Sequence, residues 1–268
     1  MRTTSDERAG IGLKISTFLV VTFLYFPLLV TFLYAFTTQT AAFTFPPPGL
    51  TTRWWGSAFS KPELWSSLRL SLSVAAVSTA LAIGIGGLLA AAVYRARFVG
   101  KNALTFIVVL PIALPGIVTG IALRSTFAQF DMPPSTWTII IGHTTFCIVI
   151  VYNNIVARLR RLPPSLAEAS SDLGASGWQT FRHIWMPNLA TAVLAGGILA
   201  FALSFDEIIV TTFVASQQKT LPIYVFEILF RPRSKPEVNV VALLAIAITF
   251  IPVMIAQLMT RDEGGHVR

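Results

Sequence analysis

Long runs without a charged side chain constrain this chain more than any other feature. Asp, Glu, Lys and Arg are absent from residues 15–52, 70–94, 102–123, 132–157, 188–205 and 238–260. A helix needs about 20 mostly apolar residues to cross a bilayer, and inside lipid every backbone polar group must be paired within the protein. The sequence therefore predicts an all-α polytopic membrane protein whose six spans lie near residues 14–36, 68–93, 103–127, 137–157, 189–214 and 239–260.

The predicted organisation is one transmembrane domain between two short tails. The tails are residues 1–13 and 261–268, the transmembrane domain is 14–260, and a polar hairpin at 158–187 interrupts it. The first span is too long for a removed signal peptide and lacks its small-residue cleavage site. Because 54% of residues are hydrophobic and only 12% are charged, no soluble domain is expected.

The polar hairpin begins with signals for a short helix. A Pro-Pro pair at 163–164 stops the preceding span. Ser165 and Glu168 have the Ser-x-x-Glu spacing of a capping box, in which each side chain accepts from the other residue's backbone amide. The helix is expected near residues 166–173, and Gly174 suits the left-handed conformation that follows many helices.

A second helix-start signal follows the glycine. Ser176 and Gln179 repeat the capping-box spacing, so another helix is expected to begin near Gly177. Two short helices joined by a glycine turn make a compact projection. The plainest interpretation of this hairpin is an ordinary loop between spans with well-made caps.

A more specific interpretation comes from the whole stretch, which reads EASSDLGASGWQTFRHIWMP from Glu168 to Pro187. It resembles the cytoplasmic EAA loop of ABC-importer permeases: Glu-Ala-Ala, three residues, Gly, nine residues and Ile-x-Leu-Pro. Ser170 replaces the third position of that pattern and Met186 its Leu. In that family the loop docks on the ATPase. The resemblance implies that the ATPase-coupling residues are Ser165, Glu168, Ala169, Ser170, Asp172, Gly174, Ile184 and Pro187.

The resemblance extends from about residue 26 to residue 260. The runs LPIALPG at 110–116 and LAFALSFDE at 199–207 are similar to permease subunits of polyamine (spermidine/putrescine) importers. That family implies the type I permease fold and a complex with a second homologous permease, two ATPases and an extracytoplasmic solute-binding protein. ATP and Mg would bind the ATPases, and this chain would bind no cofactor. Related permeases carry other small solutes, such as amines, opines, amino-acid-like compounds or sugar phosphates.

Basic residues predict the orientation. With both termini inside, twelve of the 20 Lys and Arg residues lie on the cytoplasmic side, although the basic run RPRSKPE at 231–237 opposes the rule. The ATPase-docking interpretation of the hairpin decides for cytoplasmic termini in a bacterial inner membrane. The net charge of +8 then reflects membrane topology and contact with lipid, and it does not indicate nucleic-acid binding.

Two acids interrupt the fifth span. Asp206 and Glu207 are costly within a bilayer, so they are expected to face a cavity, a partner or the membrane surface. One interpretation is a helix that meets the outer interface. The other is a pathway that attracts a small cationic solute, with Asp206 favoured over Glu207 and with nearby Ser204 in its lining.

Aromatic residues offer a second candidate contact for a cation. Trp54 and Trp55 follow FPPPGLTTR and could place ring faces near the outer mouth of a pathway. The alternative is the belt of aromatic side chains found at membrane interfaces.

Other features argue against catalysis. The chain has no GxxxxGK[ST] phosphate loop, no metal-ligand spacing and a single cysteine, Cys147, expected to be an inert buried thiol. We therefore predict no catalytic and no metal-binding residues. His143 is expected to be packed against a neighbouring helix. A membrane enzyme or a receptor scaffold remains the rival class, although no residue set of a known site accompanies it.

Small residues and prolines indicate where the predicted spans pack closely or bend. The GIGG run at 84–87 would let two helices approach closely. Pro111 and Pro115 are candidate bends in the third span and Pro252 in the sixth, because each lacks a backbone donor.

Overall fold

A computed structural model describes residues 10–39, 44–95, 99–163, 165–231 and 235–261. Within those ranges the regular structure is helical, apart from an isolated bridge between Thr37 and Leu50. Most of the two predicted tails lies outside the described residues. The chain forms two compact units, one of residues 62–226 with 247–268 and one of residues 1–61 with 227–246, and each is described by itself.

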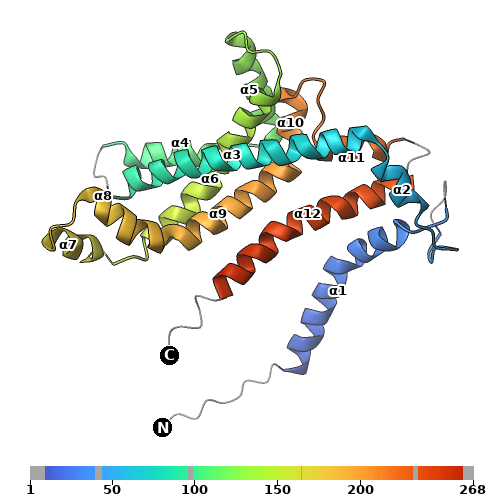
Figure 1. Ribbon diagram of the computed structural model, residues 1–268, viewed down its shortest axis with the longest axis horizontal. Helices are drawn as coiled ribbons and strands as arrows, with labels where there is room; N and C mark the ends of the chain where they lie inside the picture. Colours follow the sequence, from blue (N-terminus) through green and yellow to red (C-terminus); the bar gives the residue numbers. More distant parts are fainter. Residues whose placement is uncertain (1–9, 40–43, 96–98, 164, 232–234, 262–268) are drawn as a thin grey trace. The chain divides into compact units, whose positions relative to one another are not determined.

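Three long helices form the centre of the larger unit. These are α3 (Pro62–Arg95), α6 (Thr136–Leu159) and α9 (Met186–Asp206), which pack against one another side by side (Figure 1). Their contact is close because small residues line it. A Cβ atom added at Gly86 would lie 3.0 Å from the carbonyl oxygen of Ile148, so α3 and α6 meet almost backbone to backbone. The predicted role of the GIGG run is confirmed.

The third predicted span is broken rather than straight. It consists of α4 (Lys101–Ala113) and α5 (Gly116–Gln129), which are bent from one another by 107°. Leu114 is extended, with ψ 144°, because the ring of Pro115 disfavours helical geometry in the residue before it. Pro111 lies inside α4 without breaking it. Of the two predicted bend points, Pro115 is therefore the one that redirects the chain.

The fifth predicted span, 189–214, is also broken, which corrects the prediction of one continuous helix. α9 ends at Asp206, Glu207 is extended with ψ 117°, and α10 (Ile209–Val214) begins after it. α10 packs against both α5 and α6. Figure 1 shows it next to α5, beside the three central helices. α11 (Leu221–Leu229) follows, and its first amide donates to Ser71 Oγ on α3 at 2.8 Å.

The polar hairpin lies at one end of α9 (Figure 1). It contains α7 (Ser165–Asp172), α8 (Gly177–Thr180) and a π-helical turn, η1 (Phe181–Trp185). The π turn joins α8 to α9 directly, so the helical backbone runs without interruption over Gly177–Asp206, 30 residues. The second half of the hairpin is thus a continuous extension of a core helix.

The described residues contain four helices long and apolar enough to cross a membrane, or five if the bent α4–α5 pair counts as one span. The four are Ile11–Tyr34 (α1), Pro62–Tyr94, Thr136–Leu159 and Gly177–Asp206. The sixth predicted span coincides with α12 (Lys235–Arg261), whose apolar described stretch, Pro236–Pro252, is shorter than a full crossing. Pro252 lies inside α12 without ending it.

The smaller unit contains α1 (Ile11–Tyr34), α2 (Arg53–Phe59) and the first part of α12. Ser57 and Lys61 both bond the carboxylate of Glu237 at the start of α12. This buried acid is paired with a cation, as a charge in such a place must be.

Candidate functional site

The turn between α7 and α8 has the predicted glycine geometry. Gly174 has φ +77°, its amide donates to Ser171 O at 2.9 Å, and the amide of Ala175 donates to Ser170 O at 3.1 Å. These two bonds make a Schellman motif, which satisfies carbonyls left unpaired at a helix end. The left-handed conformation expected of Gly174 is confirmed.

The second capping box is also confirmed. The amide of Ser176 donates to Gln179 Oε1 at 2.7 Å, and the amide of Gln179 donates to Ser176 Oγ at 3.3 Å. The first box involves Ser165 and Glu168 beside residue 164, which lies outside the described residues, and it stays a prediction. Both ends of the glycine turn are therefore held by local bonds.

The sequence did not reveal what joins α7 to α8. Ser170, which departs from the family pattern, is buried, and its hydroxyl bonds Thr180 Oγ1 at 2.8 Å. The sequence signal that could have indicated this bond is a pair of hydroxyl residues ten positions apart, one on each side of the glycine turn. The bond explains why serine can replace the alanine of the family pattern, since the hydroxyl joins the two hairpin helices.

Apolar side chains project from this hairpin into the surroundings. Leu173 is 88% exposed and Trp178 is 66% exposed, and the ring of Trp178 stacks on Phe181 with 5.5 Å between centroids. The side chains of Glu168 and Asp172 are also exposed. Exposed apolar residues grouped on a polar hairpin are typical of a surface that binds another protein.

The base of the hairpin is tied to the core helices. Arg158 Nε at the end of α6 donates to Asn188 O on α9 at 2.8 Å. The ring of Trp185 meets that of Tyr94 on α3 edge-on, 6.4 Å apart. Ile184 is half-buried and Pro187 lies in the first turn of α9. A displacement of the hairpin would therefore act on α3, α6 and α9 together.

The two acids of the fifth span differ in their surroundings. Glu207 Oε1 accepts from the amide of Val210 at 2.8 Å, so this carboxylate caps the start of α10. Asp206 ends α9 and is exposed, and no residue of the described ranges pairs with its carboxylate. Of the two, Asp206 is the acid whose oxygens remain available to a ligand.

His143 is fully buried between α6, α9 and α10. Its Nδ1 lies 2.8 Å from Ser204 Oγ and its Nε2 lies 2.8 Å from Thr211 Oγ1. The prediction of a packed histidine bonded to a neighbouring helix is confirmed. Ser204, expected in a pathway lining, is only 3% exposed and has its hydroxyl committed to His143.

The neighbouring thiol lies in the same core. Cys147 is fully buried on α6, and its Sγ donates to Ala200 O on α9 at 3.4 Å. This is the environment expected of an inert packed cysteine. Within the ranges that the structure describes, no group of three or more His, Cys, Asp or Glu side chains could hold a metal ion.

The two tryptophans of the smaller unit are packed side chains. Trp54 is buried, its Nε1 donates to Thr37 O at 2.7 Å, and the Arg53 guanidinium covers its ring at 4.3 Å. The ring of Trp55 lies 5.4 Å from that of Phe36. The covered face of Trp54 makes it a poor contact for a second cation.

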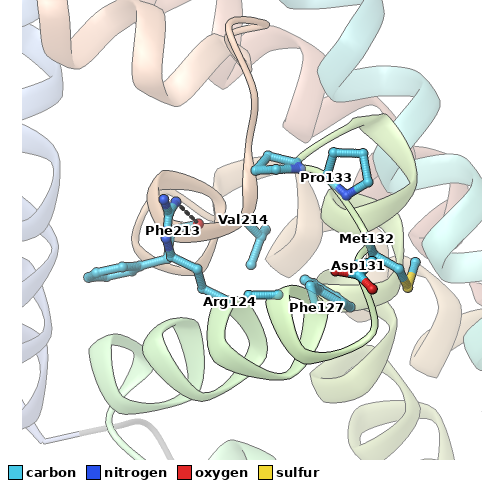
Figure 2. A pocket seen from close by; sticks show the side chains of 9 residues that line it. Arg124, Phe127, Asp131, Met132, Pro133, Phe213 and Val214 are labelled. Carbon is cyan, nitrogen blue, oxygen red and sulfur yellow. Dashed lines mark hydrogen bonds between the residues drawn. The ribbon is translucent and has the colours of Figure 1, made fainter.

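A cavity of about 450 Å³ lies between the end of α5, the following loop and the end of α10 (Figure 2). Arg124 Nη1 donates to Phe213 O at 3.0 Å across one side of it. The remaining wall is largely apolar and is formed by Phe127, Ala128, Asp131, Met132, Pro133, Pro134 and Val214. The cavity is at the N-terminal end of α6, whereas the hairpin follows its C-terminal end.

Residues 82–261 match the family described as binding-protein-dependent transport system inner membrane component. The chain is 30% identical over 254 residues to the spermidine/putrescine transport system permease protein PotC of Shigella flexneri, covering 93% of this chain and 95% of that protein. It is 33% identical over 256 residues to the putrescine transport system permease protein PotI of Escherichia coli K12, covering 92% and 90%.

Solved structures agree on the fold at low sequence identity. A bacterial alginate ABC transporter, in complex with an alginate pentasaccharide-bound periplasmic protein, superposes with a TM-score of 0.72 at 12% identity over 94% of this chain and 93% of its own. The MetNI methionine ABC transporter gives 0.63 at 16% identity over 74% and 95%.

Proposed function

Because the chain belongs to the family of inner membrane components of binding-protein-dependent transport systems, we propose that it is a permease subunit of an ATP-driven polyamine importer. The near full-length similarity to spermidine/putrescine permeases carries this proposal. The exposed Asp206 supports it, since polyamines are multivalent cations and an unpaired carboxylate attracts them.

The proposed topology has six crossings with both termini in the cytoplasm of a bacterium. The bent α4–α5 pair makes the third crossing and α12 the sixth. α6 has 24 residues and is about 36 Å long, enough for a hydrocarbon core of about 30 Å. The hairpin and the cavity flank opposite ends of α6, so a cytoplasmic hairpin puts the cavity and Asp206 toward the outer side.

The hairpin is proposed to dock on an ATPase subunit. Its exposed Leu173, Trp178 and Glu168 would contact that partner, and the bonds of Arg158 and Trp185 would pass the motion to the core helices. A second homologous permease would complete the pathway, and a second ATPase would complete the pair that hydrolyses ATP. An extracytoplasmic binding protein would deliver the solute. Alternating exposure of the pathway would follow ATP binding and release.

A permease for another small solute is the alternative. It is favoured by the structural neighbours, because the same fold serves transporters of alginate and of methionine. Asp206 discriminates, since an acidic solute would be repelled by it and a polycation attracted.

A panel of solute-loaded binding proteins tests the proposal. The complete complex in nanodiscs is mixed with binding protein loaded with putrescine, spermidine, an amino acid or a sugar phosphate, and ATP hydrolysis is measured. We expect stimulation by the two polyamine-loaded forms. Stimulation by the amino acid or sugar phosphate forms alone would establish the alternative solute class. Failure of the chain to form a complex with ATPase subunits would refute both importer hypotheses.

A further inference from the structure

We propose that His143 is a positioning residue for transport, which holds the break between α9 and α10 in the geometry that exposes Asp206. The proposal rests on the proposed function and deepens it by naming what sets the position of the pathway carboxylate. Its basis is a buried polar set composed of His143, Ser204, Thr211 and the backbone carbonyl of Glu207.

The directions of the bonds in this set follow from the number of protons available. Thr211 Oγ1 donates its only proton to the carbonyl oxygen of Glu207 at 2.8 Å. Its oxygen must therefore accept from His143 Nε2–H. Because an unpaired charge is costly in a fully buried site, the ring is neutral, and its Nδ1 accepts from the Ser204 hydroxyl. The imidazole is a neutral bridge from α9, through α6, to α10.

The bridge spans the break itself. Ser204 lies in the last turn of α9, and Thr211 lies in the first turn of α10. Among the described residues, His143 is the single side chain that bonds both, because it has two nitrogen atoms on opposite sides of a flat ring. A buried apolar residue at position 143 would leave these hydroxyls without their common partner.

Other contacts keep α6 against α10 on the same side. Thr138 Oγ1 donates to Val214 O at 2.7 Å. Gly142 faces Val210 so closely that an added Cβ would lie 3.4 Å from its Cγ1. The histidine thus acts from a helix that is fixed relative to α10 by independent contacts.

The consequence for the acids is that Glu207 is held twice. Its carbonyl accepts from Thr211, and its carboxylate accepts from the amide of Val210. Both bonds join this residue to α10, and its backbone is extended with ψ 117°, so α9 ends at Asp206. Asp206, the residue before it, remains at an exposed helix end with its oxygens unbonded by the described chain.

The test compares two substitutions at Thr211. Thr211→Val keeps the shape but removes the hydroxyl, whereas Thr211→Ser keeps the hydroxyl. Thr144→Val is the matched control, because Thr144 is also a buried hydroxyl on this core, and its one bond within the described part of the chain goes to Ile140 O of its own helix. Uptake of radiolabelled putrescine by the reconstituted complex is measured over a range of concentrations, with assembly and basal ATP hydrolysis measured on the same samples.

We expect Thr211→Val to raise KM for the cation by about tenfold, with basal ATP hydrolysis unchanged, since such networks act without touching the ligand. Thr211→Ser and Thr144→Val should stay within about twofold of wild type. An equal KM in Thr211→Val and Thr144→Val overturns the proposal. If Thr211→Val does not assemble, Ser204→Ala decides in its place by the same criterion.

A second readout does not depend on transport. Solid-state ¹⁵N spectra of the histidine-labelled complex report which ring nitrogen carries the proton, and His143→Gln identifies the signal of His143. A neutral ring protonated at Nε2 supports the proposal, and an imidazolium or a ring protonated at Nδ1 refutes it. Absence of cation uptake by the wild-type complex would refute the proposed function instead, so the two failures are distinguishable.

Discussion

At the scale of single residues, the structure separates two acids that the sequence presents as equivalent neighbours. Glu207 is used within the chain, because its carboxylate caps α10. Asp206 is exposed at the end of α9. Their different surroundings follow from the extended backbone at Glu207, where the chain leaves the axis of α9. Asp206 therefore belongs to the end of α9, whereas the Glu207 side chain reaches the start of α10.

The first prediction concerns these acids. Asp206→Asn should lower uptake of putrescine while assembly stays normal, because an ion pair at about 4 Å is worth about 1 kcal/mol in water and more where water is excluded. Glu207→Gln is the matched control, since its amide oxygen can still accept from the Val210 amide. We expect uptake by Asp206→Asn to fall about fivefold or more, because a loss of about 1 kcal/mol of interaction free energy corresponds to about a fivefold change. If uptake falls more in Glu207→Gln than in Asp206→Asn, the pathway acid is Glu207 and our assignment to Asp206 is wrong.

At the scale of elements, local patterns predicted the hairpin well and tertiary contacts limited the prediction elsewhere. Gly174 and the Ser176–Gln179 box depend on residues within one turn, so their spacing was sufficient. The break after Asp206 was missed because the apolar run continues through α10, and the features that stop the helix come from the Glu207 side chain and from α6.

The bend in the third span is an intermediate case. Pro115 indicated a bend from sequence alone, since it disfavours helical geometry at Leu114. The angle of 107° did not follow from the proline, because it depends on the packing of α5 against α10. Similarly, the bond between Ser170 and Thr180 required knowledge of how the two hairpin helices meet.

The second prediction belongs to the hairpin element. Gly174→Ala should lower uptake and stimulated ATP hydrolysis together, because a side chain in the left-handed conformation costs roughly 1–2 kcal/mol. Gly177→Ala is the matched control. An added Cβ meets nothing within 4 Å at either position, and only Gly174 has a positive φ. Normal coupling in a well-expressed Gly174→Ala complex would show that the Schellman turn is not needed for docking.

At the scale of the whole molecule, the two regions for which we propose separate tasks are divided along the length of α6. The hairpin, with its exposed leucine and tryptophan, follows one end of α6, and the cavity lies beside the other. The two acids lie at the junction of α9 and α10, which bonds α6 through His143. The core helices α3, α6 and α9 join the ends through close packing at small residues such as Gly86. A close-packed core transmits displacement with little compression, as the proposed coupling of the hairpin to the pathway requires.

Uptake into vesicles is the most direct test of the proposal that this chain forms the pathway of an ATP-driven polyamine importer. The chain is reconstituted with its second permease and ATPase subunits, with ATP inside the vesicles and polyamine-loaded binding protein outside. We expect accumulation of radiolabelled putrescine or spermidine that depends on ATP and on the binding protein. Accumulation of neither polyamine by a complex that assembles and hydrolyses ATP would contradict it.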